Sequence, residues 1–211
     1  MESLLKVEMT RHLESTVTRM LSKVQHGFSQ GRLCVTNPLE TFKAWTLALD
    51  QGYGIDIIYL DYCKAFDTVR HNGLLMKLVY YGITGGLLSW IKSFLQGCRM
   101  RVEVRGEHSD WVQVTSDVPQ GSVLGPLLFL VFVNDIPKWI SSSVWMFADD
   151  TKVWTWISAP EDGECLQEDL NRLTSWSDKW NLDFHPEKCK VMHIGHSFDT
   201  KYTRKPIANT K

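Results

Sequence analysis

A pair of adjacent aspartates between two strand-like runs constrains this sequence more than any other feature. Residues 144–148 and 152–156 are both rich in β-branched and aromatic residues, and Asp149-Asp150 separates them. Two such runs joined by a short polar connection predict a β-hairpin. The hairpin would carry two carboxylates at its tip.

A third strand-like run also ends in an aspartate. Residues 55–60 are mostly apolar and β-branched, glycines precede them, and Asp61 follows. This pattern predicts a largely buried strand. A carboxylate there is costly unless a cation or hydrogen-bond donors compensate it. Mg²⁺ prefers oxygen ligands, and two ions about 3.5–4 Å apart can clamp a phosphoryl group in transfer. Asp61, Asp149 and Asp150 suit such a site; alternatively, Asp149-Asp150 is an ordinary turn pair.

The rest of the pattern indicates an α+β fold. Residues 161–180 place leucines and tryptophans at helical spacing and carry acids in the first turn. A second hairpin is predicted over residues 101–115, and a strand over residues 190–194. We therefore expect an antiparallel sheet with helices packed on one face. Further helices are predicted over residues 3–24, 39–50, 72–81, 86–96 and 123–133.

Composition limits the functional classes. Of the 211 residues, 23 are Lys or Arg and 24 are Asp or Glu, so any polyanion must be bound by local patches. The longest apolar run, residues 123–133, is too short to span a bilayer, and the N-terminus lacks a signal-peptide pattern. We expect no membrane partner. The five cysteines include no CxxC pair and indicate reduced thiols, hence an intracellular protein of the nucleus and cytoplasm.

Several motifs together resemble one enzyme family. Residues 61–67, 119–129 and 147–150 resemble three core motifs of reverse transcriptases, in the family's order and at suitable separations. Each motif alone is weak, but the ordered set is specific. The similarity is greatest to non-LTR (LINE-type, CR1-like) retrotransposon enzymes and covers roughly residues 10–198. Three more segments resemble that group, namely residues 25–32, 133–137 and 191–196.

The resemblance implies an RNA-directed DNA polymerase with a right-hand fold. It assigns residues 1–54 to partial fingers and N-terminal helices, residues 55–196 to the palm with inserted fingers helices, and residues 197–211 to a loose polar tail. The thumb and the first fingers strands, which relatives carry in the same chain, have no counterpart here. Relatives usually have Ser and Gly where this sequence has Leu33 and Asp117.

The resemblance also implies catalytic roles. Asp61 and Asp149 would bridge two Mg²⁺ ions, with Mn²⁺ as a possible substitute, and Asp150 would support them. The backbone of Tyr62 would lie near the second metal. Lys188 resembles the lysine of the family's fourth motif, which would protonate the leaving pyrophosphate; a solvated lysine is the alternative.

The partners implied are an RNA template, a DNA primer and a deoxynucleoside triphosphate. Phe66 matches the aromatic under the incoming sugar, which rejects a 2′-hydroxyl by steric clash. Gln120 matches the glutamine beside the nucleotide pocket, and Gly121 would allow close backbone approach. Arg32 and Arg101 are candidates for nucleic-acid contact, although exposed arginines are often simply solvated.

Two other functions compete with this interpretation. One is a catalytically inactive retroelement remnant that binds nucleic acid or protein. The other is a zinc module, because His185, Cys189 and His193 would share one face of a continuous helix, with His196 next. Pro186 and the strand-like run at residues 190–194 argue against that helix.

Overall fold

The structure is a computed structural model that describes residues 1–15, 20–29, 31, 36–195, 198 and 200–203. The chain forms two compact units that alternate along the sequence. The first comprises Met1–Leu21 and Lys64–Val133, and the second comprises Ser22–Cys63 and Asn134–Lys211. The division into fingers, palm and tail at residues 54 and 196 stays a prediction.

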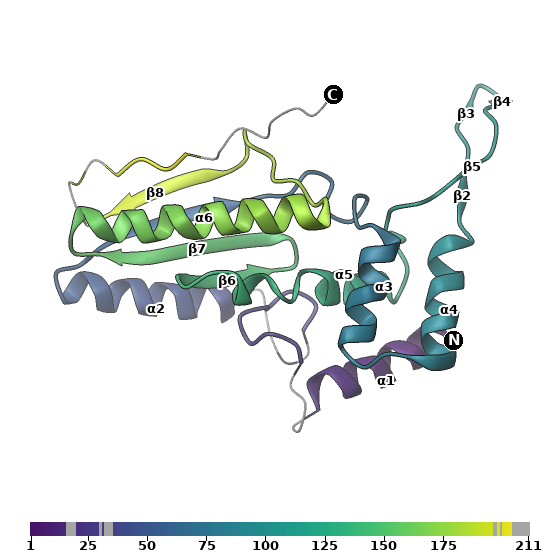
Figure 1. The fold of residues 1–211 in the computed structure, drawn as a ribbon, viewed down its shortest axis with the longest axis horizontal. Helices are drawn as coiled ribbons and strands as arrows, with labels where there is room; N and C mark the ends of the chain where they lie inside the picture. Colours follow the sequence, from purple (N-terminus) through teal and green to yellow (C-terminus); the bar gives the residue numbers. More distant parts are fainter. Residues whose placement is uncertain (16–19, 30, 32–35, 196–197, 199, 204–211) are drawn as a thin grey trace. The chain divides into compact units, whose positions relative to one another are not determined.

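The second unit is built on an antiparallel sheet of four strands, which run side by side in the order β6-β7-β1-β8 (Figure 1). All three pairings are antiparallel. The predicted buried strand, the aspartate hairpin and the strand near residue 190 are thereby confirmed. The strands are β1 (Gly54–Leu60), β6 (Ser143–Phe147), β7 (Asp150–Ile157) and β8 (Lys190–Ile194).

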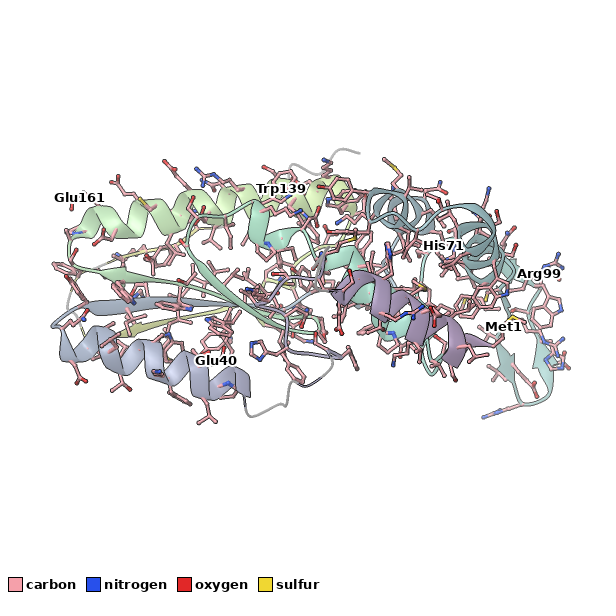
Figure 2. The ribbon with its side chains drawn as sticks, turned by 90° about the horizontal axis from the view of Figure 1, so that it is seen from below. Met1, Glu40, His71, Arg99, Trp139 and Glu161 are labelled. Carbon is pink, nitrogen blue, oxygen red and sulfur yellow. The ribbon has the colours of Figure 1, made fainter. Side chains whose placement is uncertain are left out.

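Helices cover both faces of this sheet. Ile55 and Ile57 of β1 pack in a cluster with Trp45 of α2 (Thr36–Asp50). Their alternate neighbours Ile58 and Leu60 line an apolar pocket with leucines of α6 (Pro160–Trp180). Successive side chains of a strand point to opposite faces, so the two helices lie on opposite sides of the strands (Figure 2). The α+β antiparallel fold is confirmed, but the expectation of helices on one face is wrong, because β1 is apolar on both faces.

The sequence defines both ends of α6. Asp162 Oδ2 accepts hydrogen bonds from the backbone N–H groups of Ser158 and Ala159, at 2.8 and 3.0 Å, and holds the first turn. These bonds lower the pKa of Asp162. Asn181 ends the helix in a left-handed conformation at φ 53°. The apolar stripe between them lies against the sheet and includes the buried residues Leu166, Leu173 and Trp176.

The first unit is mainly helical. Its core is α5, in which eight of nine residues are buried. The predicted helix over residues 3–24 is wrong in its extent, because Ser15 takes an extended ψ of 144° and the helix ends at Glu14. No helix in the described parts of the chain is long and apolar enough to cross a membrane. The helices are α1 (Glu2–Glu14), α3 (His71–Tyr80), α4 (Gly85–Gln96) and α5 (Gly125–Val133).

The predicted second hairpin is present in this unit as two short ladders. Arg105 and Gly106 form its turn at φ 52° and 86°, as a two-residue turn with positive φ at both positions requires. Arg101 lies between the ladders, and its guanidinium carbon is 4.7 Å from the centre of the Trp111 ring. The strands are β2 (Arg99–Met100) paired with β5 (Val112–Gln113), and β3 (Glu103–Val104) paired with β4 (Glu107–His108).

Candidate active site

Asp61 is held by backbone pairing that continues past the end of β1. The Cys63 N–H donates to the Asp183 carbonyl at 2.7 Å, and the His185 N–H donates to the Asp61 carbonyl at 2.8 Å. Tyr62 forms an isolated antiparallel bridge with Phe184 between these two bonds. The backbone of Asp61 is therefore fixed on both sides, although the regular strand stops one residue earlier.

The register of the sheet places a second aspartate opposite Asp61. Leu60 pairs with Thr151 in the β1–β7 ladder, so the next positions outward are Asp61 and Asp150. Facing residues of an antiparallel pair share one face, with Cβ atoms about 4.5–5.5 Å apart. Asp149 lies in the adjoining turn between β6 and β7. The three predicted carboxylates thus lie at one end of one sheet.

The carboxylates at this end of the sheet repel one another. Asp150 lies at the outer edge of this sheet end and is exposed. The surrounding protein nevertheless removes enough water from its carboxyl group to raise its pKa. The charges of Asp149 and Asp61 raise that pKa further, and Lys152 and Lys188 oppose them. Two lysines therefore compensate three carboxylates only in part.

Lys188 forms an ion pair with Asp61. Its Nζ atom lies 3.3 Å from Asp61 Oδ1, and the two side chains are 59% and 33% exposed. An ion pair this exposed is weak, on the order of 0–1 kcal/mol. The ammonium is therefore held near the carboxylates by a contact that breaks easily.

These charged groups line a cavity of about 300 Å³ on the α2 face of the sheet. Asp61 and Asp150 lie beside Lys152 and Lys188 in its wall. Such a mixture suits an anionic group that arrives with a cation, since lysines attract phosphate oxygens and carboxylates attract the metal. The apolar part of the lining comes from Pro38, Tyr59, Leu60, Trp145 and Phe147.

The donor set fits a divalent cation. Carboxylate oxygens are the ligands that such ions prefer, and a cation would relieve the repulsion that raises the pKa of Asp150. Within the described residues, no three His, Cys, Asp or Glu side chains are gathered closely enough to hold an ion. Asp61, Asp149 and Asp150 are the carboxylates at this sheet end that are candidates to hold a cation.

Tyr62 contributes its backbone rather than its side chain. Its ring is buried and stacks on Phe184, with the ring centroids 4.8 Å apart. Burial raises the pKa of its hydroxyl well above the ordinary range. The side chain is part of the core behind Asp61, which agrees with the predicted backbone role without testing it.

The predicted nucleotide-pocket residues lie together in the first unit. The Phe66 ring stacks on buried Phe129 at 4.4 Å, and Gln120 Nε2 donates to Asp67 Oδ1 at 2.7 Å. Gly121 occupies a positive φ of 85°. A backbone bond of 3.1 Å closes its turn, from the N–H of Ser122 to the carbonyl of Pro119. A type II turn requires such a φ at its third position.

Asp117, two residues before Pro119, is strained. Its φ of 119° is one that residues with a side chain rarely adopt, and its Oδ1 atom is buried without a hydrogen-bond partner. Burial and the charge of Asp67 raise the pKa of Asp117, while His71 lowers it.

Comparison of the sequence with protein-family models identifies the family of this chain. The family model described as "Reverse transcriptase (RNA-dependent DNA polymerase)" matches residues 2–207. The chain belongs to the reverse transcriptase family. This confirms the family inferred from the ordered motifs.

Two insect relatives agree. The reverse transcriptase chain is 35% identical over 188 residues to the "RNA-directed DNA polymerase from mobile element jockey" of Drosophila melanogaster. It is 32% identical over 191 residues to the "Probable RNA-directed DNA polymerase from transposon BS" of the same species. Each alignment covers 82% of this chain and 20% of the relative. The chain therefore spans about a fifth of the length of these relatives.

Solved structures show the same fold. An apo telomerase from Candida tropicalis aligns with a TM-score of 0.65 at 10% identity, over 90% of this chain and 36% of that one. A C-terminally truncated form of that telomerase gives a TM-score of 0.63 at 12% identity, over 96% of this chain and 42% of the other. At these identities the likeness establishes the polymerase fold alone.

The motifs of this reverse transcriptase chain did not point to two residues, one in each compact unit, that fix predicted site residues locally. Asp67 anchors Gln120, and its signal is its place at the end of the first motif. Gln25 bonds the turn before Asp149, and its signal is the similar segment at residues 25–32. Arg32 lies outside the described residues, and the nucleic-acid role of Arg101 stays a prediction.

The zinc alternative finds no support in the geometry. β8 makes residues 190–194 a strand, so His185, Cys189 and His193 do not share a helical face. His193 Nδ1 lies 2.5 Å from Asp56 Oδ1 instead. His196 lies outside the described residues.

Proposed function

We propose that this chain carries the nucleotidyl-transfer site of an RNA-directed DNA polymerase. One observation carries the proposal: Asp61 and Asp150 directly follow the last residue pair of the β1–β7 ladder and line one cavity, with Asp149 in the adjoining turn and Lys188 3.3 Å from Asp61. The insect relatives, which are named as RNA-directed DNA polymerases, support it. The substrates proposed are an RNA template, a DNA primer and deoxynucleoside triphosphates. A structurally similar protein, a Candida tropicalis telomerase, has been solved in complex with a fragment of telomeric RNA, which supports nucleic-acid binding.

Asp61 and Asp149 would hold the divalent ions, two Mg²⁺ or Mn²⁺, and Asp150 would support them. Bound there, the ions would supply a lowered pKa for the primer 3′-hydroxyl and charge stabilisation at the phosphate. The 3′-hydroxyl gives its proton to water and its oxygen forms a bond to the α-phosphorus. The bond from that phosphorus to the bridging oxygen breaks, and this oxygen leaves with the pyrophosphate. Lys188, close to Asp61, donates a proton to the leaving pyrophosphate.

Phe66, Gln120 and Gly121 would select the nucleotide. The Phe66 ring is backed by Phe129, so it cannot easily retreat from a 2′-hydroxyl. Gln120 is oriented by Asp67 and would contact the nucleotide beside the open backbone at Gly121. Arg101, and Arg32 outside the described residues, are proposed contacts to phosphate.

The test is extension of a DNA primer on an RNA template by the 211-residue chain with Mg²⁺ and deoxynucleotides. We expect the wild type to extend the primer and Asp149→Ala to lose at least about 100-fold in rate, as losses at metal sites commonly do. Asp178→Ala, an exposed position on α6, is the matched control and should match the wild type. Folded protein that binds a primer–template but extends nothing would instead identify a non-catalytic remnant.

A further inference from the structure

A segment distant in sequence is paired with the strand that leads to the catalytic turn. The Met146 N–H donates to the Val24 carbonyl at 2.9 Å, and the His26 N–H donates to the Met146 carbonyl at 2.8 Å. Gln25 and Met146 thus form a parallel bridge on the outer edge of β6. The pairing brings Gln25 beside the last residues before Asp149.

The Gln25 side chain then continues the pairing past the end of the strand. Its Nε2 donates to the Ala148 carbonyl at 3.1 Å, and its Oε1 accepts from the Ala148 N–H at 2.9 Å. The same Oε1 accepts from the Gly27 N–H at 2.9 Å. Gln25 is only 4% exposed, so these bonds form away from water. A side-chain amide satisfies both backbone groups of Ala148, as a neighbouring strand would.

Ala148 is a residue that needs such support. Its φ of 54° lies in the left-handed region, which is costly for residues other than glycine. It directly precedes Asp149, so its backbone angles decide where that carboxylate points. Gly27 packs so closely that a Cβ atom there would lie 2.2 Å from the Ala148 nitrogen. Contacts from this segment therefore help to fix the turn.

We propose that Gln25 is a positioning residue that locks the Ala148 backbone and so aims Asp149 and Asp150 at the divalent ion. This inference rests on the proposed function, since it assigns Gln25 to the same metal site. Gln25 touches neither substrate nor ion and acts through the turn. Its loss releases the turn and weakens metal binding more than it weakens the fold.

Direct binding of Mn²⁺, measured from the electron paramagnetic resonance signal of the free ion, tests this without requiring polymerase activity. Gln25→Met keeps the length of the side chain and removes both hydrogen-bonding groups. Gln167→Met is a matched control, because Gln167 makes the same paired bonds to the N–H and carbonyl of Thr203, away from the acids. Circular dichroism at the binding temperature verifies that each variant is folded.

We expect Gln25→Met to weaken Mn²⁺ binding by about 10-fold or more, the range typical of groups that orient metal ligands. Gln167→Met should stay within about twofold of the wild type. The inference is overturned if the Gln25 and Gln167 variants bind Mn²⁺ equally well while Asp149→Ala loses binding, and the proposed function then stands. If the wild type binds no better than Asp149→Ala, the metal site itself fails, and the role of Gln25 fails with it.

Discussion

Two aspartates on one strand, five residues apart, have opposite environments. Asp56 is 0% exposed, and its carboxylate meets His193 Nδ1 at 2.5 Å, Thr200 Oγ1 at 2.7 Å and the Tyr202 hydroxyl. Asp61 is one-third exposed, pairs with the exposed head group of Lys188 and feels the charge of neighbouring carboxylates. A buried carboxylate with enough donors stabilises a fold, whereas one short of donors destabilises it unless a ligand arrives.

The two positions also face opposite sides of the sheet. Asp56 shares the α6 face with Ile58, and it holds the segment at Thr200 and Tyr202 against that side. A Cβ atom on Gly163 of α6 would lie 3.0 Å from Thr200 Cγ2, so the packing there is tight. Asp61 opens into the cavity on the α2 face. The same strand thus contributes a structural carboxylate to one side and the carboxylate proposed to bind metal to the other.

The largest expected effect separates these roles directly. Asp56→Ala should lower the free energy of unfolding by about 2–3 kcal/mol, because three polar partners lose their acceptor; partial exposure of His193 keeps the loss below that of a fully buried pair. Asp61→Ala, the same substitution on the same strand, should change the free energy of unfolding by less than about 0.5 kcal/mol. Urea unfolding followed by circular dichroism measures both. Equal losses at the two positions would refute the distinction.

A smaller effect, a gain in stability instead of a loss, is expected at the sheet end where the carboxylates repel one another. Asp150→Asn removes a charge that Asp149 and Asp61 oppose, so the melting temperature without metal should rise by about 1–3 °C. The partial exposure of Asp150 keeps this gain small. Mn²⁺ should raise the melting temperature of the wild type more than that of Asp150→Asn. The exposed control Asp178→Asn should show neither change, and a fall in the melting temperature of Asp150→Asn would contradict the repulsion.

The parts of this structure that sequence predicts are those with local signals. The apolar, β-branched run of β1 and the turn residues between β6 and β7 lie within short windows, and they place Asp61, Asp149 and Asp150 at strand ends. The roles of Asp56 and Gln25 depend on partners 137 and 123 residues away, which no local pattern specifies. The apolar residues on both faces of β1 indicate that helices cover both faces of the sheet. The antiparallel strand pattern instead favoured helices on one face only.

The smallest effect concerns a third aspartate, which lacks both the donors of Asp56 and the ligand proposed for Asp61. Asp117→Gly should raise the free energy of unfolding by about 0.5 kcal/mol at neutral pH, because glycine accepts a φ of 119° and leaves no buried oxygen without a partner. The greater freedom of glycine in the unfolded chain offsets part of the gain. The backbone bonds of Asp117 to Val69 and His71 remain possible in this variant. Asp117→Ala removes the carboxylate but keeps the strained backbone, so its gain should be smaller.

The pH dependence separates the two contributions at Asp117. Burial and the charge of Asp67 raise its pKa in the folded state, and His71 opposes them, so protonation stabilises the folded wild type. The cost of the carboxylate is therefore present at neutral pH and disappears as the pH falls through the raised pKa. The gain of Asp117→Ala should vanish at acid pH, whereas the difference between Asp117→Gly and Asp117→Ala should persist, because backbone strain does not titrate. Denaturant unfolding at neutral and acid pH measures both, and a gain for Asp117→Ala that stays constant with pH would show that the carboxylate costs the fold nothing.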